Sequence, residues 1–240
     1  MAEIKQAWWL AKFEVKEIAK RLWLILPFAL VFGFFFTVAI EEEISFLYDI
    51  FFIICFWCMT YWMRPKEIQF QKVDEGVYAS PYFLMLNQLA VKREALIVSR
   101  FLIYFIFAIP FNIIVLTIML VFSDFYRTEL QGVSSAAFFV IWLSFGIIGG
   151  ALFPASDVGD TTTKNKWFYA IYTILFFGIL LGAILGVHFW AGKGVVLLSI
   201  EAAQKWPAIA IISSVILSVI SIVYGKKYAE KQIRRMNYLK

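Results

Sequence analysis

The chain has 240 residues, 62% of them hydrophobic, and its mean hydropathy is +0.79. A soluble domain is typically about 45–50% apolar, so this composition excludes an ordinary soluble particle and makes lipid the solvent for much of the surface. The formal net charge is +5. Because the basic residues flank apolar stretches, the charge indicates membrane topology and contact with anionic headgroups rather than nucleic-acid binding.

Apolar and basic side chains alternate at helical spacing in the first 21 residues. The pattern predicts an amphipathic helix over residues 1–21 that lies in the membrane interface, with a plain extension of the first span as the alternative. The charged region is too long for a signal peptide, so we expect the first span to be retained. The apolar face consists of Ile4, Trp8, Ala11, Val15, Ile18 and Leu22, and the lysines on other faces are Lys5, Lys12, Lys16 and Lys20.

Six apolar stretches follow, each close to the roughly 20 residues that a helix needs to cross the hydrocarbon core. They predict an all-α, polytopic membrane protein with a transmembrane domain over residues 22–224. Tryptophan and tyrosine gather near the ends of the stretches, as at membrane interfaces. The predicted spans are Leu22–Ile40, Ser45–Met63, Phe101–Phe122, Ala136–Phe153, Trp167–Trp190 and Pro207–Tyr224.

The basic residues predict the orientation of these spans. The N-terminal segment, the loops after spans two and four, and the basic tail 225–240 hold nineteen lysines and arginines. The opposite side holds three, Arg127, Lys193 and Lys205. Since cytoplasmic loops carry an excess of lysine and arginine, both termini are expected in the cytoplasm.

Chemistry inside the predicted membrane region is sparse. Asp49 and His188 are the only ionisable residues in the spans, both near span ends, and no partner for His188 can be named from spacing. We therefore expect His188 to face headgroups or a loop. Cys55 and Cys58 are interpreted as apolar fillers, because neither a second cysteine pair nor a nearby histidine completes a metal site. No phosphate-binding loop motif occurs, so no catalytic residue, metal or cofactor is assigned to this chain.

The long loop over residues 64–100 differs from a flexible linker. Ser80 and Pro81 are typical of a helix start, and a short apolar face follows at helical spacing, from Phe83 through Leu86 to Leu89 or Ala90. Such a helix beside a membrane needs a place for its apolar side chains. It could lie on the bilayer or dock into a groove of a cytosolic partner.

The segment from Leu86 to Leu102, Leu-Asn-Gln-Leu-Ala-Val-Lys-Arg-Glu-Ala-Leu-Ile-Val-Ser-Arg-Phe-Leu, resembles the ABC exporter permeases of the type-2 family. Typical members have Leu-Pro-Val where this chain has Leu89-Ala90-Val91. The resemblance, which extends to six spans and an N-terminal interfacial helix, implies that residues 82–94 form a coupling helix. The residues that would contact a separate cytosolic ATPase are then Tyr82, Phe83, Leu86, Asn87, Leu89, Lys92, Arg93 and Glu94.

The resemblance implies the rest of the assembly as well. ATP and magnesium would bind to the ATPase subunit, and a second permease subunit, identical or paralogous, would complete the pathway in a bacterial plasma membrane. The segment 187–206 would form short outer helices. Spans rich in phenylalanine, leucine and isoleucine suit a hydrophobic or amphipathic cargo, such as a peptide, a drug or a lipid. The alternatives are a membrane scaffold or sensor without transport and an ion-coupled secondary carrier, which the scarcity of central carboxylates disfavours.

Overall fold

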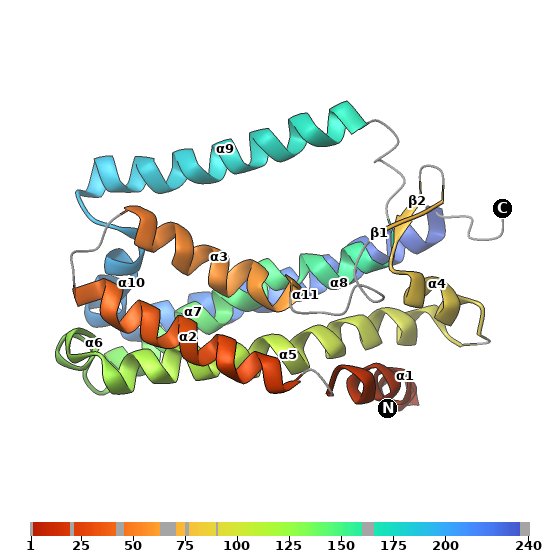
Figure 1. Cartoon of the computed structure of the whole chain (residues 1–240), viewed down its shortest axis with the longest axis horizontal. Helices are drawn as coiled ribbons and strands as arrows, with labels where there is room; N and C mark the ends of the chain where they lie inside the picture. The colour runs from red at the N-terminus through yellow and green to blue at the C-terminus, as the bar shows by residue number, and fades with distance from the viewer. Residues whose placement is uncertain are drawn as a thin grey trace.

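Figure 1 shows the computed structural model of the chain, which describes residues 2–19, 22–41, 46–62, 71–74, 77–89, 91–159 and 166–235. These ranges are helical apart from short connections and one small hairpin. The helices are α1 (Ala2–Ala19), α2 (Leu22–Glu41), α3 (Phe46–Trp62), α4 (Pro81–Asn87), α5 (Arg93–Phe122), α6 (Asp124–Glu129), α7 (Val133–Gly150), α8 (Leu152–Asp157), α9 (Lys166–Ala191), α10 (Val195–Lys205) and α11 (Pro207–Arg235).

Four helical stretches have the length and composition to cross a membrane. They are Arg93–Phe122, Val133–Pro154, Thr173–Ala191 and Pro207–Arg235. Two further apolar stretches, Ile25–Ile40 and Phe46–Cys58, are shorter. The chain is thus a helical membrane protein by the length and apolarity of its helices. The membrane crossings of α2 and α3, and with them the total of six spans, stay a prediction.

The long loop contains a hairpin that the sequence analysis did not predict. Strand β1 (Gln71–Asp74) pairs antiparallel with β2 (Val77–Ala79), with Gln71 opposite Ala79. The hairpin is a small addition to a fold that is otherwise helical in the described residues, as predicted. A two-stranded hairpin has little stability of its own, so it depends on the helical segment that follows it.

Two helices extend beyond their predicted spans, and both do so at the same end of the bundle. Helix α5 begins at Arg93 and has 30 residues, about 45 Å, which exceeds the hydrocarbon thickness. Helix α11 runs past Tyr224 to Arg235, so the predicted basic tail is helical over most of its length. We call this the basal end, where α1, α4 and the end of α11 meet, and the opposite end, which carries α6 and α10, the distal end (Figure 1). Helix α1 and the last turns of α11 lie at the same end of the bundle, which is consistent with an even number of membrane crossings.

The interior of the bundle is built from aromatic rings and small residues. The ring of Phe52 on α3 lies 4.9 Å from that of Phe56 and meets Trp142 of α7 edge-on at 4.4 Å. Gly150 of α7 lies so close to α5 that a Cβ there would be 2.0 Å from the Tyr104 hydroxyl. Small residues let membrane helices approach closely and gain dispersion contacts. The structure therefore explains the glycines near the end of the fourth predicted span by packing.

Short helices close the distal end. Helix α10 buries Val196, Ile200 and Ala203, and the indole N–H of Trp142 donates a hydrogen bond of 2.9 Å to the Ser199 hydroxyl. The 187–206 segment thus contains the last turn of α9 and one short helix, α10, that packs on α7. The outer position implied by the resemblance stays a prediction.

Candidate functional site

The start of α4 confirms the helix signal in the sequence. The Ser80 hydroxyl accepts a hydrogen bond from the Phe83 N–H at 3.4 Å, and Pro81 occupies the first turn. The helix has seven residues and ends at Asn87. Arg93 and Glu94 belong to the first turn of α5, with Lys92 as its N-cap. The predicted coupling segment 82–94 is therefore two helices joined by a turn.

The apolar face of α4 points into the chain itself. Phe83 and Leu86 are buried in a cluster at the basal end, which we call the basal cluster. Its buried members come from α1, α4, α5 and α11 and from Ala151 and Val158, which flank α8. They are Leu10, Phe83, Leu86, Leu96, Ile97, Phe101, Ala151, Val158, Ala229 and Ile233. The resemblance implies that Phe83 and Leu86 contact a cytosolic ATPase. In the structure their side chains pack within the basal cluster and attach α4 to its own bundle. Contact between α4 and an ATPase stays a prediction.

A different set of side chains faces outward. Met85 is 52% exposed and Leu89 is 46% exposed, and Lys92, Arg93 and Glu94 are exposed beside them. The Lys92 ammonium lies 3.9 Å from the Glu3 carboxylate of α1, a surface contact of small energetic weight. Tyr82 and Asn87 are half-buried at the edge of this face, and burial raises the pKa of the Tyr82 hydroxyl. This outward set, an apolar pair with charged neighbours, is the exposed surface around α4 and the start of α5.

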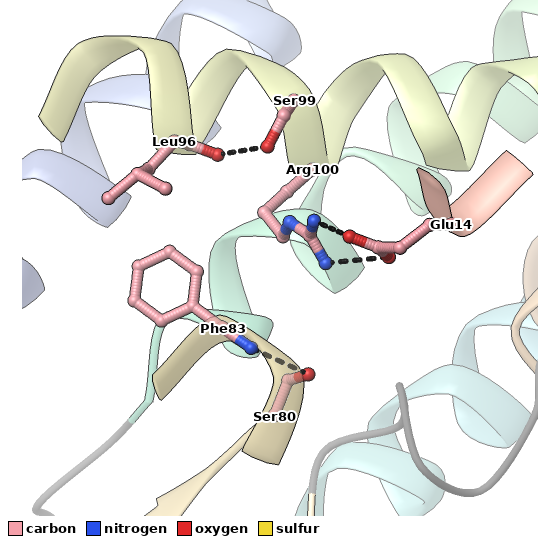
Figure 2. Close-up of polar contacts among 6 residues, drawn as sticks. All are labelled: Glu14, Ser80, Phe83, Leu96, Ser99 and Arg100. Atoms are coloured by element: carbon pink, nitrogen blue, oxygen red, sulfur yellow. Dashed lines mark hydrogen bonds and ion pairs between the residues drawn. The ribbon is translucent and has the colours of Figure 1, made fainter. Parts of the chain in front are cut away.

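A buried ion pair lies directly behind α4. The Arg100 guanidinium of α5 and the Glu14 carboxylate of α1 are each 1% exposed and form two parallel hydrogen bonds (Figure 2), of which Nη1 to Oε2 measures 2.8 Å. The face of the Tyr82 ring lies 5.4 Å from the guanidinium carbon, close enough for a cation–π contact. Within the part of the chain that the structure describes, Arg100 Nε makes no hydrogen bond. The pair therefore binds α1 to α5 with a charge-assisted, planar geometry.

Helix α8 completes this arrangement. The Ser80 N–H donates a hydrogen bond of 3.0 Å to the Asp157 carbonyl, which joins the start of α4 to the end of α8. The fully buried Asp157 carboxylate also interacts electrostatically with Arg100. The basal cluster and these polar contacts thus connect α4 to α1, α5, α8 and α11.

The ion pair is absent from the sequence-based prediction, which treats Arg100 as a loop charge and gives Glu14 no role. The predicted apolar face of α1 includes Ile4 and Trp8. In the structure Ile4 and Trp8 are exposed, as are Trp9 and Phe13, while the buried face is Ala7, Leu10, Ala11 and Glu14. That i, i+3, i+4, i+7 spacing is visible in the sequence. A carboxylate on such a face signals a buried cationic partner.

The distal end holds a second polar contact that was not predicted. His188 lies 2.8 Å, through Nε2, from the Asp49 carboxylate, so the two ionisable residues of the spans meet each other. The expectation that His188 faces headgroups or a loop is wrong, because the fold brings the end of α9 beside the start of α3.

Comparisons of the chain with models of protein families, with curated proteins and with solved structures give no match. What the geometry defines is a class, a helical membrane protein with a buried apolar cluster at the end where α1 and α11 meet.

Proposed function

We propose that this chain is the membrane-spanning permease subunit of an ATP-driven exporter that works with a separate cytosolic ABC ATPase. The observation that carries the proposal is the placement of α4. One face of this short helix is buried in the basal cluster, and the other presents Met85 and Leu89 outward among charged residues. A helix that must receive force from a partner needs both properties, a free face for docking and a firm connection to the spans.

The mechanism follows from these contacts. ATP and magnesium bind to the ATPase, whose closure pushes on the outward face of α4. Because Phe83 and Leu86 pack against α5 and α11, a displacement of α4 moves the basal ends of these two long helices. The Arg100–Glu14 pair makes α1 follow α5. Six spans, with both termini in the cytoplasm and the chain in a plasma membrane, are part of this proposal.

A second permease subunit completes the assembly. Over the 18 most apolar consecutive residues of α9, the buried share is 6%. The corresponding share for α5 is 44%. Three glycines of α9, Gly178, Gly182 and Gly186, have open space where a Cβ would lie. Glycines four residues apart on a membrane helix allow another helix to approach closely. The two subunits would enclose a pathway for a hydrophobic or amphipathic cargo.

The first test is whether a neighbouring coding sequence carries a phosphate-binding loop ATPase, because this proposal requires one. The second test combines that ATPase with the full chain in lipid nanodiscs. Leu89→Asp places a charge on the outward face of α4, and we expect loss of co-purification and of permease-stimulated ATP hydrolysis at unchanged thermal stability. Val133→Asp, at an exposed apolar residue of the distal end, is the matched control and should keep both. Full stimulation by Leu89→Asp would overturn the proposed coupling role of α4 and favour a scaffold or sensor.

A further inference from the structure

A carboxylate on α3 serves as the N-cap of α10, which begins 146 residues further along the chain. Asp49 Oδ2 accepts a hydrogen bond from the Val195 N–H at 2.6 Å, and Oδ1 accepts one from the Val196 N–H at 3.1 Å. The residue at the N-cap position of α10 itself is Gly194, which has no side chain to offer. The first N–H groups of a helix need acceptors, and a negative charge there complements the helix dipole.

The same carboxylate holds the last turn of α9. His188 Nε2 lies 2.8 Å from Asp49 Oδ2, and the imidazole meets the Phe46 ring edge-on at a centroid distance of 5.7 Å. Asp49 is fully buried, so an ionised carboxylate needs donors on every side. With Nε2 protonated, His188 supplies the third donor beside the two backbone N–H groups of α10.

The turn between α9 and α10 is shaped around this carboxylate. A Cβ added to Gly194 would lie 2.6 Å from Asp49 Oδ2, closer than such an atom can approach. Gly192 has φ +63°, a left-handed conformation that glycine adopts without strain. The two glycines of the Gly192-Lys193-Gly194 turn thus have a structural reason. Gly192 permits the left-handed backbone, and Gly194 lets Asp49 reach the N–H groups of α10.

Helix α10 is the fixed partner in this arrangement. Its buried residues pack on the bundle, Trp142 of α7 binds Ser199, and the Gln204 side chain donates to the Glu129 carbonyl at 2.7 Å. Helix α9 is packed lightly by comparison. Among its described side chains only Ile184 is buried, and Figure 1 shows α9 along one edge of the molecule, next to α3 and joined at its distal end to α10.

We propose that Asp49 is the pivot of a hinged α9. The carboxylate binds the distal end of α9 to α3 and α10, and the helix turns about this point with the largest displacement at its basal end. The part of α9 from His188 back to Lys166 is a lever of about 33 Å, so a rotation of about 5° at Asp49 moves the basal end by about 3 Å. This hinge rests on contacts within the chain and does not require an ATPase. A second subunit packed on α9 would limit the rotation, so the distances are measured on nanodiscs that hold one copy of the chain.

The experiment measures distances in the full chain in nanodiscs by electron spin resonance. Spin labels at Ile171 on α9 and at Leu89 report the position of the basal end of α9, and a pair at Leu89 and Tyr224 on α11 is the control. His188→Ala should broaden the Ile171 distribution and leave the control pair unchanged. Hydrogen exchange of the Val195 and Val196 amides should also stay unchanged in this variant.

Asp49→Ala removes both functions of the carboxylate. It should broaden the Ile171 distribution and speed exchange of the two α10 amides by roughly 5- to 30-fold, the range expected for loss of an N-cap. Glu201→Gln, which alters another acid of α10, is the matched control and should leave the distances unchanged. An unchanged Ile171 distribution in His188→Ala would overturn the hinge, and so would equal broadening of the control pair. If Asp49→Ala does not fold, His188→Ala alone decides between these outcomes.

Discussion

Removal of one partner of the Arg100–Glu14 pair should destabilise the protein far more than removal of both. Both side chains are 1% exposed, so Glu14→Ala leaves an arginine charge buried behind α4. Breaking a buried pair in this way typically costs about 3–5 kcal/mol. The Asp157 carboxylate and the Tyr82 ring still face Arg100, which places the expected loss of unfolding free energy near the lower bound, about 3 kcal/mol.

The assay is a double-mutant cycle by reversible unfolding of the full chain in lipid or mild detergent. Arg100→Met should destabilise by a similar amount, because it leaves the Glu14 carboxylate buried. Glu14→Leu combined with Arg100→Met should lie within about 1 kcal/mol of the wild type or be more stable, since apolar side chains of similar size can replace a buried pair. The exposed Lys226–Glu230 pair of α11 is the control, with an expected coupling of at most about 0.5 kcal/mol. A loss below about 1 kcal/mol for Glu14→Ala would refute the buried pair.

Three further predictions concern other parts of the chain. Gly150→Ala should destabilise by several kcal/mol, roughly 2–4, because its Cβ would collide with the Tyr104 hydroxyl, and the thermal midpoint should fall accordingly. The Lys193 ammonium lowers the pKa of the Glu201 carboxyl, so this contact stabilises α10 above the ordinary carboxyl pKa and is lost as pH falls through the lowered value. Protection of the α10 amides from hydrogen exchange should therefore decrease at acidic pH in the wild type and decrease less in Glu201→Gln. The same pH dependence in both proteins would contradict the contact. Gly182→Leu should weaken self-association in detergent at unchanged monomer stability, and full association would exclude α9 as the interface.

The helices could be predicted from the sequence to a large extent, because apolarity over about 20 residues is a local property. The positions of α5, α7, α9 and α11 followed from it, as did the start of α4 from Ser80 and Pro81. The ends of the helices could not be predicted in this way, because α5 and α11 continue as helices beyond their apolar stretches. What stabilises these extensions is the basal cluster, whose members are spread along the chain from Leu10 to Ile233.

The candidate site shows the same division at the level of side chains. The sequence predicts a short helix with apolar residues in the loop, but it does not show which face of this helix is buried and which is exposed. Only the packed structure shows that Phe83 and Leu86 face inward and that Leu89 faces outward. Periodicity identifies an apolar face without stating whether lipid, a partner or the chain itself will cover it.

The sequence by itself determined that this chain uses lipid as a solvent, that its basic residues flank the apolar stretches, and that ionisable groups are rare within those stretches. These are sums over local composition, so they need no fold. The tertiary structure alone decided which of the rare charges meet. Glu14 reaches Arg100 across 86 residues and Asp49 reaches His188 across 139, because a buried charge is stable only where folding brings its partner to it.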